Sequence, residues 1–210
     1  MTIAVFLDRD GTLNQEAGYI REIDKLTLIP GAAQAVRRLN DAGLLSVLTT
    51  NQSGVARGFY DEAHILALHA RLAQLLEAQA GARLDAYYYC PFHERGVVEA
   101  YRQDSPLRKP ATGMIDRACE AFPAIDRARS FVVGDKPSDV SFAVNAGCRS
   151  VMLKTGYGAR ALAGQYQQMI HPPERICDSI VEAVDWILSQ TATAHAAIEA
   201  NPTAAPPQGG

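Results

Sequence analysis

The sequence predicts an α/β protein with a doubly wound, mainly parallel sheet, and three observations support this fold class. Short apolar runs alternate with segments of helical periodicity along most of the chain. Strands that alternate with helices pair in parallel and connect through right-handed crossovers. Polar clusters follow three of the apolar runs directly, which is where ligands bind in such sheets. The 210 residues are also enough for one buried core.

The first apolar run, residues 3–7, ends at Asp8, Arg9 and Asp10 before a Gly-Thr turn, and it predicts a strand buried on both faces. Two neighbouring carboxylates repel each other, and burial adds a desolvation penalty. A bound Mg²⁺ with oxygen ligands compensates for both costs. In an extended segment alternate side chains point the same way, so Asp8 and Asp10 are expected to face one ligand while Arg9 points elsewhere. A lone aspartate here would be read as an ordinary loop residue.

The remaining elements follow in chain order. Two long irregular segments, 13–29 and 90–107, are expected to be functional loops. Apolar spacing and turn residues predict helices over 30–42, 61–79, 113–122, 137–147 and 178–188, and strands over 44–49, 84–89, 130–133 and 150–153. His64 and His69 lie five residues apart on the second helix and do not share one face, so both are expected at the surface.

The domain organisation is simple. Residues 1–189 are expected to form a single domain with loops but no separate cap domain, because no insertion is large enough for one. Residues 190–210 are rich in Thr, Ala, Pro, Gln and Gly and are expected to form a disordered tail. The helical bias of 192–200 leaves open that the last helix extends into it.

Composition limits the partners. The net charge of −3 and pI near 5.9 argue against binding nucleic acid or an anionic membrane, while leaving room for a local pocket for a small anion. Without a long apolar run or a signal sequence, we expect a cytoplasmic protein, and a monomer. The four cysteines are 29 residues apart, but their neighbours differ, and free thiols are expected.

Three polar pairs lie just past predicted strands: Asp8 and Asp10, Thr50 and Asn51, Asp135 and Asp139. The carboxyl ends of parallel strands meet at one edge of a sheet, so a single crevice is expected to gather them.

These residues resemble the motifs of a known family, the haloacid dehalogenase-like (HAD) phosphohydrolases. The four motifs occur in family order within residues 3–155, as Asp8-x-Asp10-Gly11-Thr12, Thr50-Asn51-Gln52, Lys109 and Gly134-Asp135-x3-Asp139. The longer runs 8–14, 50–58, 89–91 and 108–110 resemble the heptose-bisphosphate phosphatase branch most, and the histidinol-phosphatase branch is its closest competitor.

The resemblance implies a mechanism in which Asp8 is the nucleophile and forms an aspartyl-phosphate. Asp10 would protonate the leaving alkoxide and then activate water, if its environment favours the protonated form. Mg²⁺ would be held by Asp8, Asp135 and the backbone carbonyl of Asp10. Asp139 would order metal-bound water or Lys109.

The resemblance also implies donors for the phosphoryl group. Thr50 and Asn51 would hydrogen-bond its oxygens, and Lys109 would stabilise the charge of the transition state and keep Asp8 ionised. Arg108 would contact the substrate, for which a distal phosphate is one possibility, because its planar guanidinium suits a bidentate oxyanion. The other residues expected to bind substrate are Gln52, Ser53, Arg57 and Lys136.

One segment departs from the family pattern. Relatives that carry zinc hold the second long loop with Cys-x-His and Cys-x-Cys, whereas this chain has Cys90 and a displaced His93, with Ser105 and Leu107 in place of the second pair. A structural zinc site needs four ligands, so a bound zinc is not expected. Packing of apolar and aromatic side chains is expected to hold this loop instead.

The implied reaction is Mg²⁺-dependent hydrolysis of a phosphate monoester of a small sugar, foremost the 7-phosphate of D-glycero-D-manno-heptose 1,7-bisphosphate. The loops 14–29, 51–60 and 90–107 would shape an open, polar pocket for it. Histidinol phosphate is the alternative substrate, and a non-catalytic module that binds phosphosugars is the alternative from another class. A nucleic-acid 3′-phosphatase is disfavoured by the acidic balance of the chain.

Overall fold

The computed structural model describes residues 1–199, with only the backbone described for 193–199. Its centre is a parallel sheet in the order β3-β2-β1-β4-β5-β6. The strands are β1 (Ala4–Leu7), β2 (Leu45–Asn51), β3 (Ala86–Cys90), β4 (Phe131–Gly134), β5 (Arg149–Leu153) and β6 (Arg175–Cys177). This order confirms the predicted doubly wound sheet; β6, which the sequence did not reveal, extends it at one edge.

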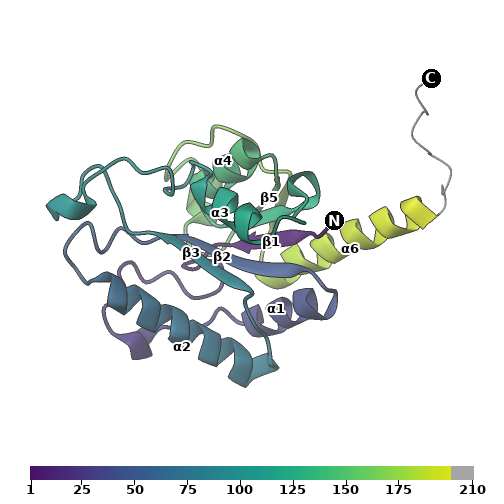
Figure 1. Cartoon of the computed structure of the whole chain (residues 1–210), viewed down its shortest axis with the longest axis horizontal. Helices are drawn as coiled ribbons and strands as arrows, with labels where there is room; N and C mark the ends of the chain where they lie inside the picture. Colours follow the sequence, from purple (N-terminus) through teal and green to yellow (C-terminus); the bar gives the residue numbers. More distant parts are fainter. Residues whose placement is uncertain (200–210) are drawn as a thin grey trace.

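Helices cover both faces of the sheet (Figure 1). They are α1 (Ala32–Asp41), α2 (Glu62–Ala80), α3 (Gly113–Ala121), α4 (Pro137–Ala146), α5 (Gly158–Leu162) and α6 (Ile180–Glu199). The first core cluster joins α1, α2 and α6 to one face, and a second joins α3 and α4 to the other. The short helix α5 follows β5 and packs on α4 and β5 through a small third cluster.

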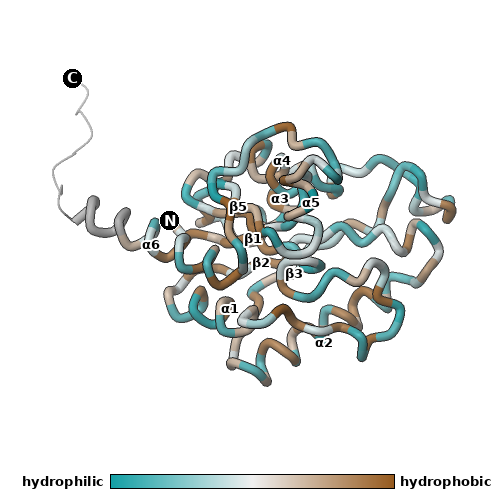
Figure 2. The backbone as a smooth tube through the Cα atoms, turned by 180° about the vertical axis from the view of Figure 1, so that it is seen from behind, coloured by the Kyte–Doolittle hydropathy of each residue, from teal (hydrophilic) through white to brown (hydrophobic). Residues whose placement is uncertain are grey.

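The central strand β1 explains why its sequence is apolar without interruption. Val5 and Leu7 belong to the core under α1 and α6, whereas Ala4 and Phe6 belong to the core under α3 and α4. All four side chains are fully buried. Burying a side chain of the size of Val, Leu or Phe contributes about 1.5–3 kcal/mol each. Figure 2 shows the apolar positions gathered in the central strands and the polar ones in the surrounding loops.

The last helix crosses the domain boundary that the sequence predicts at residue 189. The backbone of α6 remains helical to Glu199, in keeping with the helical bias of 192–200. The rest of the predicted tail, residues 200–210, lies outside the described residues.

The cysteines are free thiols, as expected, and three of the four are buried. In residues 1–199, no helix combines the length and the apolar character needed to cross a bilayer.

His69 on α2 is buried, so its predicted surface position is wrong. Its ring is 5 % exposed and lies 5.6 Å from the ring of Tyr87 and 5.7 Å from that of Tyr89. Neither ring nitrogen has a hydrogen-bond partner. Burial, and then the positive charge of Arg9, lower the pKa of His69 from 6.5 to about 3, so the folded protein holds this ring neutral at neutral pH.

We expect the free energy of unfolding of His69→Leu to depend less on pH below pH 7 than that of the wild type. A base with a depressed pKa contributes stability that is present above its unfolded pKa and is lost as the pH falls toward its folded pKa, here from 6.5 toward about 3. Between pH 7 and pH 5 the wild type should therefore lose about 2 kcal/mol more than the variant. Urea unfolding at both pH values measures this difference, and equal losses in the two proteins would contradict it.

Candidate active site

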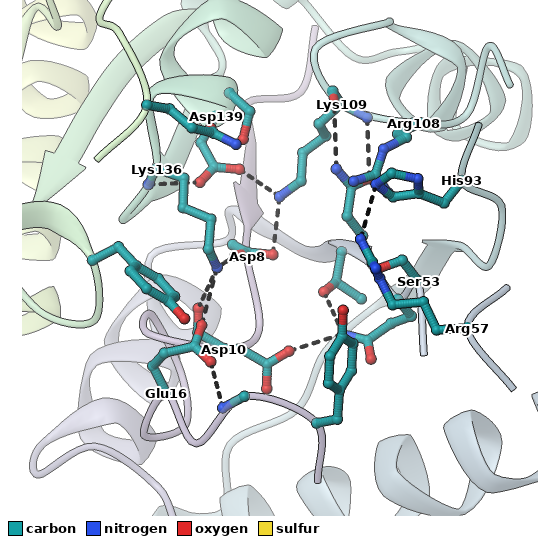
Figure 3. A pocket seen from close by; sticks show the side chains of 18 of the residues that line it. Asp8, Asp10, Glu16, Ser53, Arg57, His93, Arg108, Lys109, Lys136 and Asp139 are labelled. Carbon is teal, nitrogen blue, oxygen red and sulfur yellow. Dashed lines mark hydrogen bonds and ion pairs between the residues drawn. The ribbon is translucent and has the colours of Figure 1, made fainter. Parts of the chain in front are cut away.

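A polar pocket of about 310 Å³ lies beyond the carboxyl ends of β1, β2 and β4 (Figure 3). All predicted site residues except Asp135 line it, and the buried Asp135 lies beside Asp8 and Asp139. Carboxylates and two lysines occupy one side, and arginines with a histidine occupy the other. The lining residues come from segments 8–19, 50–60, 93–109, 136–139 and 157–167.

Asp8 and Lys109 form the centre of the pocket. The Lys109 Nζ donates to Asp8 Oδ1 at 2.9 Å and to the Thr49 carbonyl at 3.0 Å, and it lies 2.5 Å from Asp139 Oδ1. Burial alone would raise the pKa of Asp8, but Lys109 and then Lys136 outweigh it and lower that pKa below 3.8. Asp8 is therefore ionised at neutral pH, as a carboxylate nucleophile must be.

Three carboxylates, two that follow β1 and β4 and one in the first turn of α4, lie close together. Asp8, Asp135 and Asp139 each offer an oxygen within 4.8 Å of the others, and all three are buried. Close approach depends on glycines, because a Cβ at Gly11 or Gly156 would lie 2.3 or 2.2 Å from Asp135 Oδ2. Both glycines have positive φ, of 83° and 54°, which other residues rarely adopt.

Asp135 is the least satisfied of these carboxylates. Its Oδ2 accepts from the Tyr157 backbone N–H at 2.8 Å, but its buried Oδ1 accepts no hydrogen bond and has only an ion pair with Lys136 at 3.3 Å. Burial, together with the charges of Asp8 and Asp139, raises the pKa of Asp135 to about 7, although Lys136 opposes this. Buried oxygens that lack donors suit a hard divalent cation.

Lys136 lies among the predicted metal ligands. Its Nζ is 3.7 Å from Asp8 Oδ2, 3.3 Å from Asp135 Oδ1 and 3.5 Å from the Asp10 carbonyl, and it also pairs with Glu16 at 3.2 Å. Burial would lower the pKa of Lys136, but these carboxylates outweigh it and raise the pKa. The Asp10 carbonyl thus faces the same point as the carboxylates, as the family resemblance implies. The substrate-binding role expected for Lys136 stays a prediction.

Asp139 serves the site and the helix at once. Its Oδ2 accepts from the Lys136 backbone N–H at 3.0 Å, which caps α4, and its Oδ1 pairs with Lys109. This agrees with the expectation that Asp139 orders Lys109. Its position in the carboxylate cluster also makes it a candidate metal ligand, a role that the sequence analysis did not give it.

The Asp10 carboxylate turns away from this cluster. It accepts hydrogen bonds from Arg9, Asn14 and Gln52, whereas the ion-pair partners of Asp8 are Lys109 and Lys136. Both side chains line the same pocket, so the expectation that Asp8 and Asp10 face one ligand stays a prediction. At the carboxylate cluster itself it is the Asp10 carbonyl, not its carboxylate, that lies near Lys136. Arg9 does not line the pocket, and its buried guanidinium pairs with the Asp10 carboxylate.

Residues at the end of β2 form hydrogen bonds to Lys109 and Asp10 and so connect the parts of the site. The Asn51 side chain forms two hydrogen bonds with the Lys109 backbone, donating to its carbonyl at 3.2 Å and accepting from its N–H at 3.1 Å. Gln52 donates to Thr50 Oγ1 at 3.0 Å and to Asp10 Oδ2 at 2.8 Å. Thr50, Asn51 and Gln52 line the pocket together with Ser53. Their contacts show positioning, and their expected bonds to phosphate or substrate stay predictions.

Arg57, His93 and Arg108 form a basic cluster on the other side of the pocket. His93 Nδ1 accepts from the Arg95 backbone N–H at 2.9 Å, so in the neutral ring the hydrogen is on Nε2. That nitrogen lies 3.4 Å from Arg57 Nη2, and the buried Arg57 Nε has no partner. Burial, then Arg108 and Arg57, lower the pKa of His93. Donors that face each other without an acceptor mark a place for an anion.

Contacts between its own side chains and backbone stabilise the loop 90–107, which lacks the zinc-binding pattern of the relatives. The rings of Phe92 and Tyr101 pack 5.7 Å apart, as expected, and Cys90 Sγ donates to the Phe92 carbonyl at 3.8 Å. His93 faces Arg57 rather than Cys90. The expectation that the loop binds no zinc stays a prediction.

Several lining residues escaped the sequence analysis. They are Glu16, Gly18, Tyr19, Tyr60, His93, Ser138, Tyr157, Tyr166 and Gln167. The last three come from the segment after β5, so a fourth loop joins the three that were expected to shape the pocket. One signal could have found it: Lys154-Thr155-Gly156 directly follows a predicted strand, as the other polar clusters do.

The chain is similar to known proteins in sequence and in fold. A family model described as HAD-hydrolase-like matches residues 106–183. The chain is 50 % identical over 192 residues to a D-glycero-D-manno-heptose-1,7-bisphosphate 7-phosphatase of Thermosynechococcus vestitus, covering 90 % of this chain and 97 % of that protein. It is 38 % identical over 185 residues to D-glycero-beta-D-manno-heptose-1,7-bisphosphate 7-phosphatase of Haemophilus ducreyi, covering 88 % and 97 %.

A solved structure resembles the fold over nearly the whole chain. It is the D,D-heptose 1,7-bisphosphate phosphatase of B. bronchiseptica complexed with magnesium and phosphate, with a TM-score of 0.78, 32 % identity, and coverage of 90 % of this chain and 99 % of that one. The chain therefore belongs to the HAD-like phosphohydrolases, within the branch of heptose-bisphosphate phosphatases, and is a phosphoric monoester hydrolase.

Proposed function

We propose that this enzyme uses Mg²⁺ to remove the 7-phosphate of D-glycero-D-manno-heptose 1,7-bisphosphate through an aspartyl-phosphate on Asp8. The observation that carries the proposal is the division of the pocket into a carboxylate side and a basic side (Figure 3). The first suits a metal and a nucleophile, and the second suits another phosphate on the same substrate. The names of the similar proteins support the choice of sugar.

Asp8, Asp135 and the Asp10 carbonyl would hold the magnesium ion, with Asp139 close enough to join them. The Asp135 Oδ1, which accepts no hydrogen bond, and the close approach allowed by Gly11 and Gly156 fit such an ion. When bound, Mg²⁺ supplies positive charge that offsets the charge of the phosphate and orients it. In that state the Lys136 ammonium would turn to the phosphate, which is the substrate role expected for it.

The residues of the chain divide the chemistry between them. Asp8 attacks phosphorus as the bond to the sugar oxygen breaks, and Asp10 gives its proton to that oxygen. Water then attacks the aspartyl-phosphate, returns a proton to Asp10 and releases phosphate and the Asp8 carboxylate. Lys109 and Thr50 would donate to the phosphoryl oxygens, together with Asn51.

The basic cluster of Arg57, His93 and Arg108 would bind the second phosphate, with Ser53 beside it. An adjoining hollow of about 580 Å³ shares His93, Arg108 and Lys109 with the pocket and leaves room for the body of a sugar. Both phosphates of one small molecule could thus be bound at once, and Arg57 and Arg108 would favour a bisphosphate over a monophosphate.

A phosphate-release assay with Mg²⁺ tests the substrate assignment. The panel holds both anomers of heptose 1,7-bisphosphate, heptose 7-phosphate and histidinol phosphate, and metal content is measured in parallel. We expect the highest kcat/KM for one bisphosphate anomer and loss of activity with EDTA that Mg²⁺ restores. A preference for histidinol phosphate would identify that molecule as the substrate instead. Binding without turnover would indicate a non-catalytic module that binds phosphosugars.

We expect Arg57→Met to weaken selection for the second phosphate. A charged hydrogen bond contributes about 1.5–3 kcal/mol, so kcat/KM for the bisphosphate should fall by roughly 10- to 100-fold. The value for heptose 7-phosphate should change much less, because that substrate places no phosphate there. Arg37→Met removes an exposed arginine paired with Asp41 on α1 and serves as the control. Equal losses on both substrates would place the second phosphate elsewhere.

The proposal also covers the oligomeric state, the binding partners and the cellular location of the protein. We propose a cytoplasmic monomer that acts on a small phosphorylated sugar, without nucleic acid or membrane. The net negative charge of the chain disfavours binding to nucleic acid or to an anionic membrane. Size-exclusion chromatography with light scattering measures the oligomeric state.

A further inference from the structure

Arg9 is the largest fully buried side chain of the protein's described part, with an exposure of 1 %. It lies two residues after the end of β1, whose Val5 and Leu7 face the core under α1 and α6. An apolar side chain would suit this position, since a buried ion pair is seldom more stable than well-packed apolar groups. The arginine therefore needs a reason other than stability.

The partners of Arg9 indicate that reason. Its Nη2 donates to Asp10 Oδ2 at 3.0 Å and to Oδ1 at 3.2 Å, and its Nε lies 3.3 Å from Oδ1. Nη2 also donates to Gln52 Oε1 at 2.9 Å, while Nη1 has no partner. Asp10 is the only carboxylate that pairs with Arg9 among the described residues. The guanidinium is thus dedicated to the side chain that would transfer the proton.

The network around Arg9 fixes one orientation of the Asp10 carboxylate. Asn14 donates to Oδ1 at 3.0 Å and Gln52 donates to Oδ2 at 2.8 Å. Arg9 and Gln52 also bond each other, which closes a triangle of hydrogen bonds on Oδ2. Gln52 in turn donates to Thr50 Oγ1, so the group that would donate to phosphate is held by the same network.

We propose that Arg9 is a positioning residue, which holds the Asp10 carboxyl group in the orientation needed to protonate the oxygen of the leaving sugar. The inference rests on the proposed function, because it takes Asp10 as the group that protonates that oxygen. A planar guanidinium suits this task, since its fork contacts both carboxylate oxygens at once and resists their rotation. Small misplacements of a catalytic group are enough to reduce the rate strongly.

The test compares two leaving groups. A sugar phosphate needs a proton on its leaving oxygen, whereas p-nitrophenyl phosphate releases a stabilised phenolate that needs little help. Because kcat/KM reports the steps up to loss of the leaving group, it isolates the first proton transfer from the later hydrolysis. General acid catalysis contributes about 10²- to 10⁴-fold.

We expect Arg9→Met to lower kcat/KM for the sugar phosphate by about 10²-fold and for p-nitrophenyl phosphate by less than about 10-fold. Arg9→Lys keeps the charge without the fork and should restore only part of the loss. Arg127→Met, which removes the ion pair with Asp116 outside the pocket, should leave both values unchanged. Equal losses on both substrates in Arg9→Met would overturn the proposal, because a merely structural role predicts them.

Asp10→Asn separates this proposal from the one it rests on. If Asp10→Asn shows no dependence on the leaving group, the acid role of Asp10 fails; if it shows one and Arg9→Met does not, only the role of Arg9 fails. Where circular dichroism shows that Arg9→Met is unfolded, Gln52→Met decides, because it removes the other donor to Asp10 Oδ2 together with an acceptor for Arg9. The same selective loss supports the proposal, and an equal loss overturns it.

Discussion

Replacing Asp8 with asparagine is expected to abolish turnover and leave the fold intact. The amide has no negative charge and cannot form the aspartyl-phosphate, so kcat should fall by roughly 10⁴-fold or more. The fold should persist because Lys109 keeps its ion pair with Asp139 and its hydrogen bond to the Thr49 carbonyl. Phosphate release and thermal unfolding, measured on the same preparation, give both results.

The Asp8 variant also tests the covalent route directly. The wild type, quenched in acid during turnover, should carry phosphate on the protein, whereas Asp8→Asn should carry none. Asp116→Asn changes an aspartate outside the pocket and is the matched control. Full activity of Asp8→Asn would exclude the aspartyl-phosphate mechanism.

Lys109→Met is expected to damage both stability and catalysis. Burial would lower the pKa of Lys109, but Asp139 and Asp8 outweigh it and raise the pKa, so the ammonium is held charged between two buried carboxylates. Removing it leaves both carboxylates without their main counter-charge and should cost about 3–5 kcal/mol of unfolding free energy. The loss of transition-state stabilisation should lower kcat by about 10²- to 10³-fold.

The pH dependence of the Lys109 variant has a defined sign. Burial, opposed by Lys109, already raises the pKa of Asp139 in the wild type, and removing the lysine raises it further. Acid conditions then neutralise the unpaired carboxylates, so the stability gap between wild type and variant should narrow as the pH falls from 8 to 5. Lys109→Arg keeps the charge and should regain more stability than activity. A gap that widens in acid would contradict this account.

The sequence predicted the fold wherever local chemistry was sufficient. The run before Asp8 identifies β1 because each of its side chains is buried on one face or the other. The other strands up to β5 follow from short apolar runs, and the helices between them follow from helical spacing of apolar residues. The three-residue strand β6 and the five-residue helix α5 were missed because so few residues carry no periodic signal.

The sequence predicted where the secondary-structure elements lie better than it predicted which side chains contact each other. His69 was assigned to the surface because its spacing was compared only with His64. It lies four residues after Ile65 and three before Leu72, on the buried face of α2, where the rings of Tyr87 and Tyr89 lie against it. The sequence analysis did not foresee that Arg9, which was expected only to point away from the ligand, pairs with the Asp10 carboxylate.

The sequence by itself determined that carboxylates, hydroxyls and a lysine stand at the ends of buried strands, because burial periodicity and turn residues are local properties of the chain. Only the tertiary structure decided which of them meet: Asp139 joins Asp8 and Asp135, Asp10 turns to Arg9, and a basic cluster forms from two loops. Such pairings depend on distances between segments that are far apart in the chain, and the packing of the helices on the sheet sets those distances.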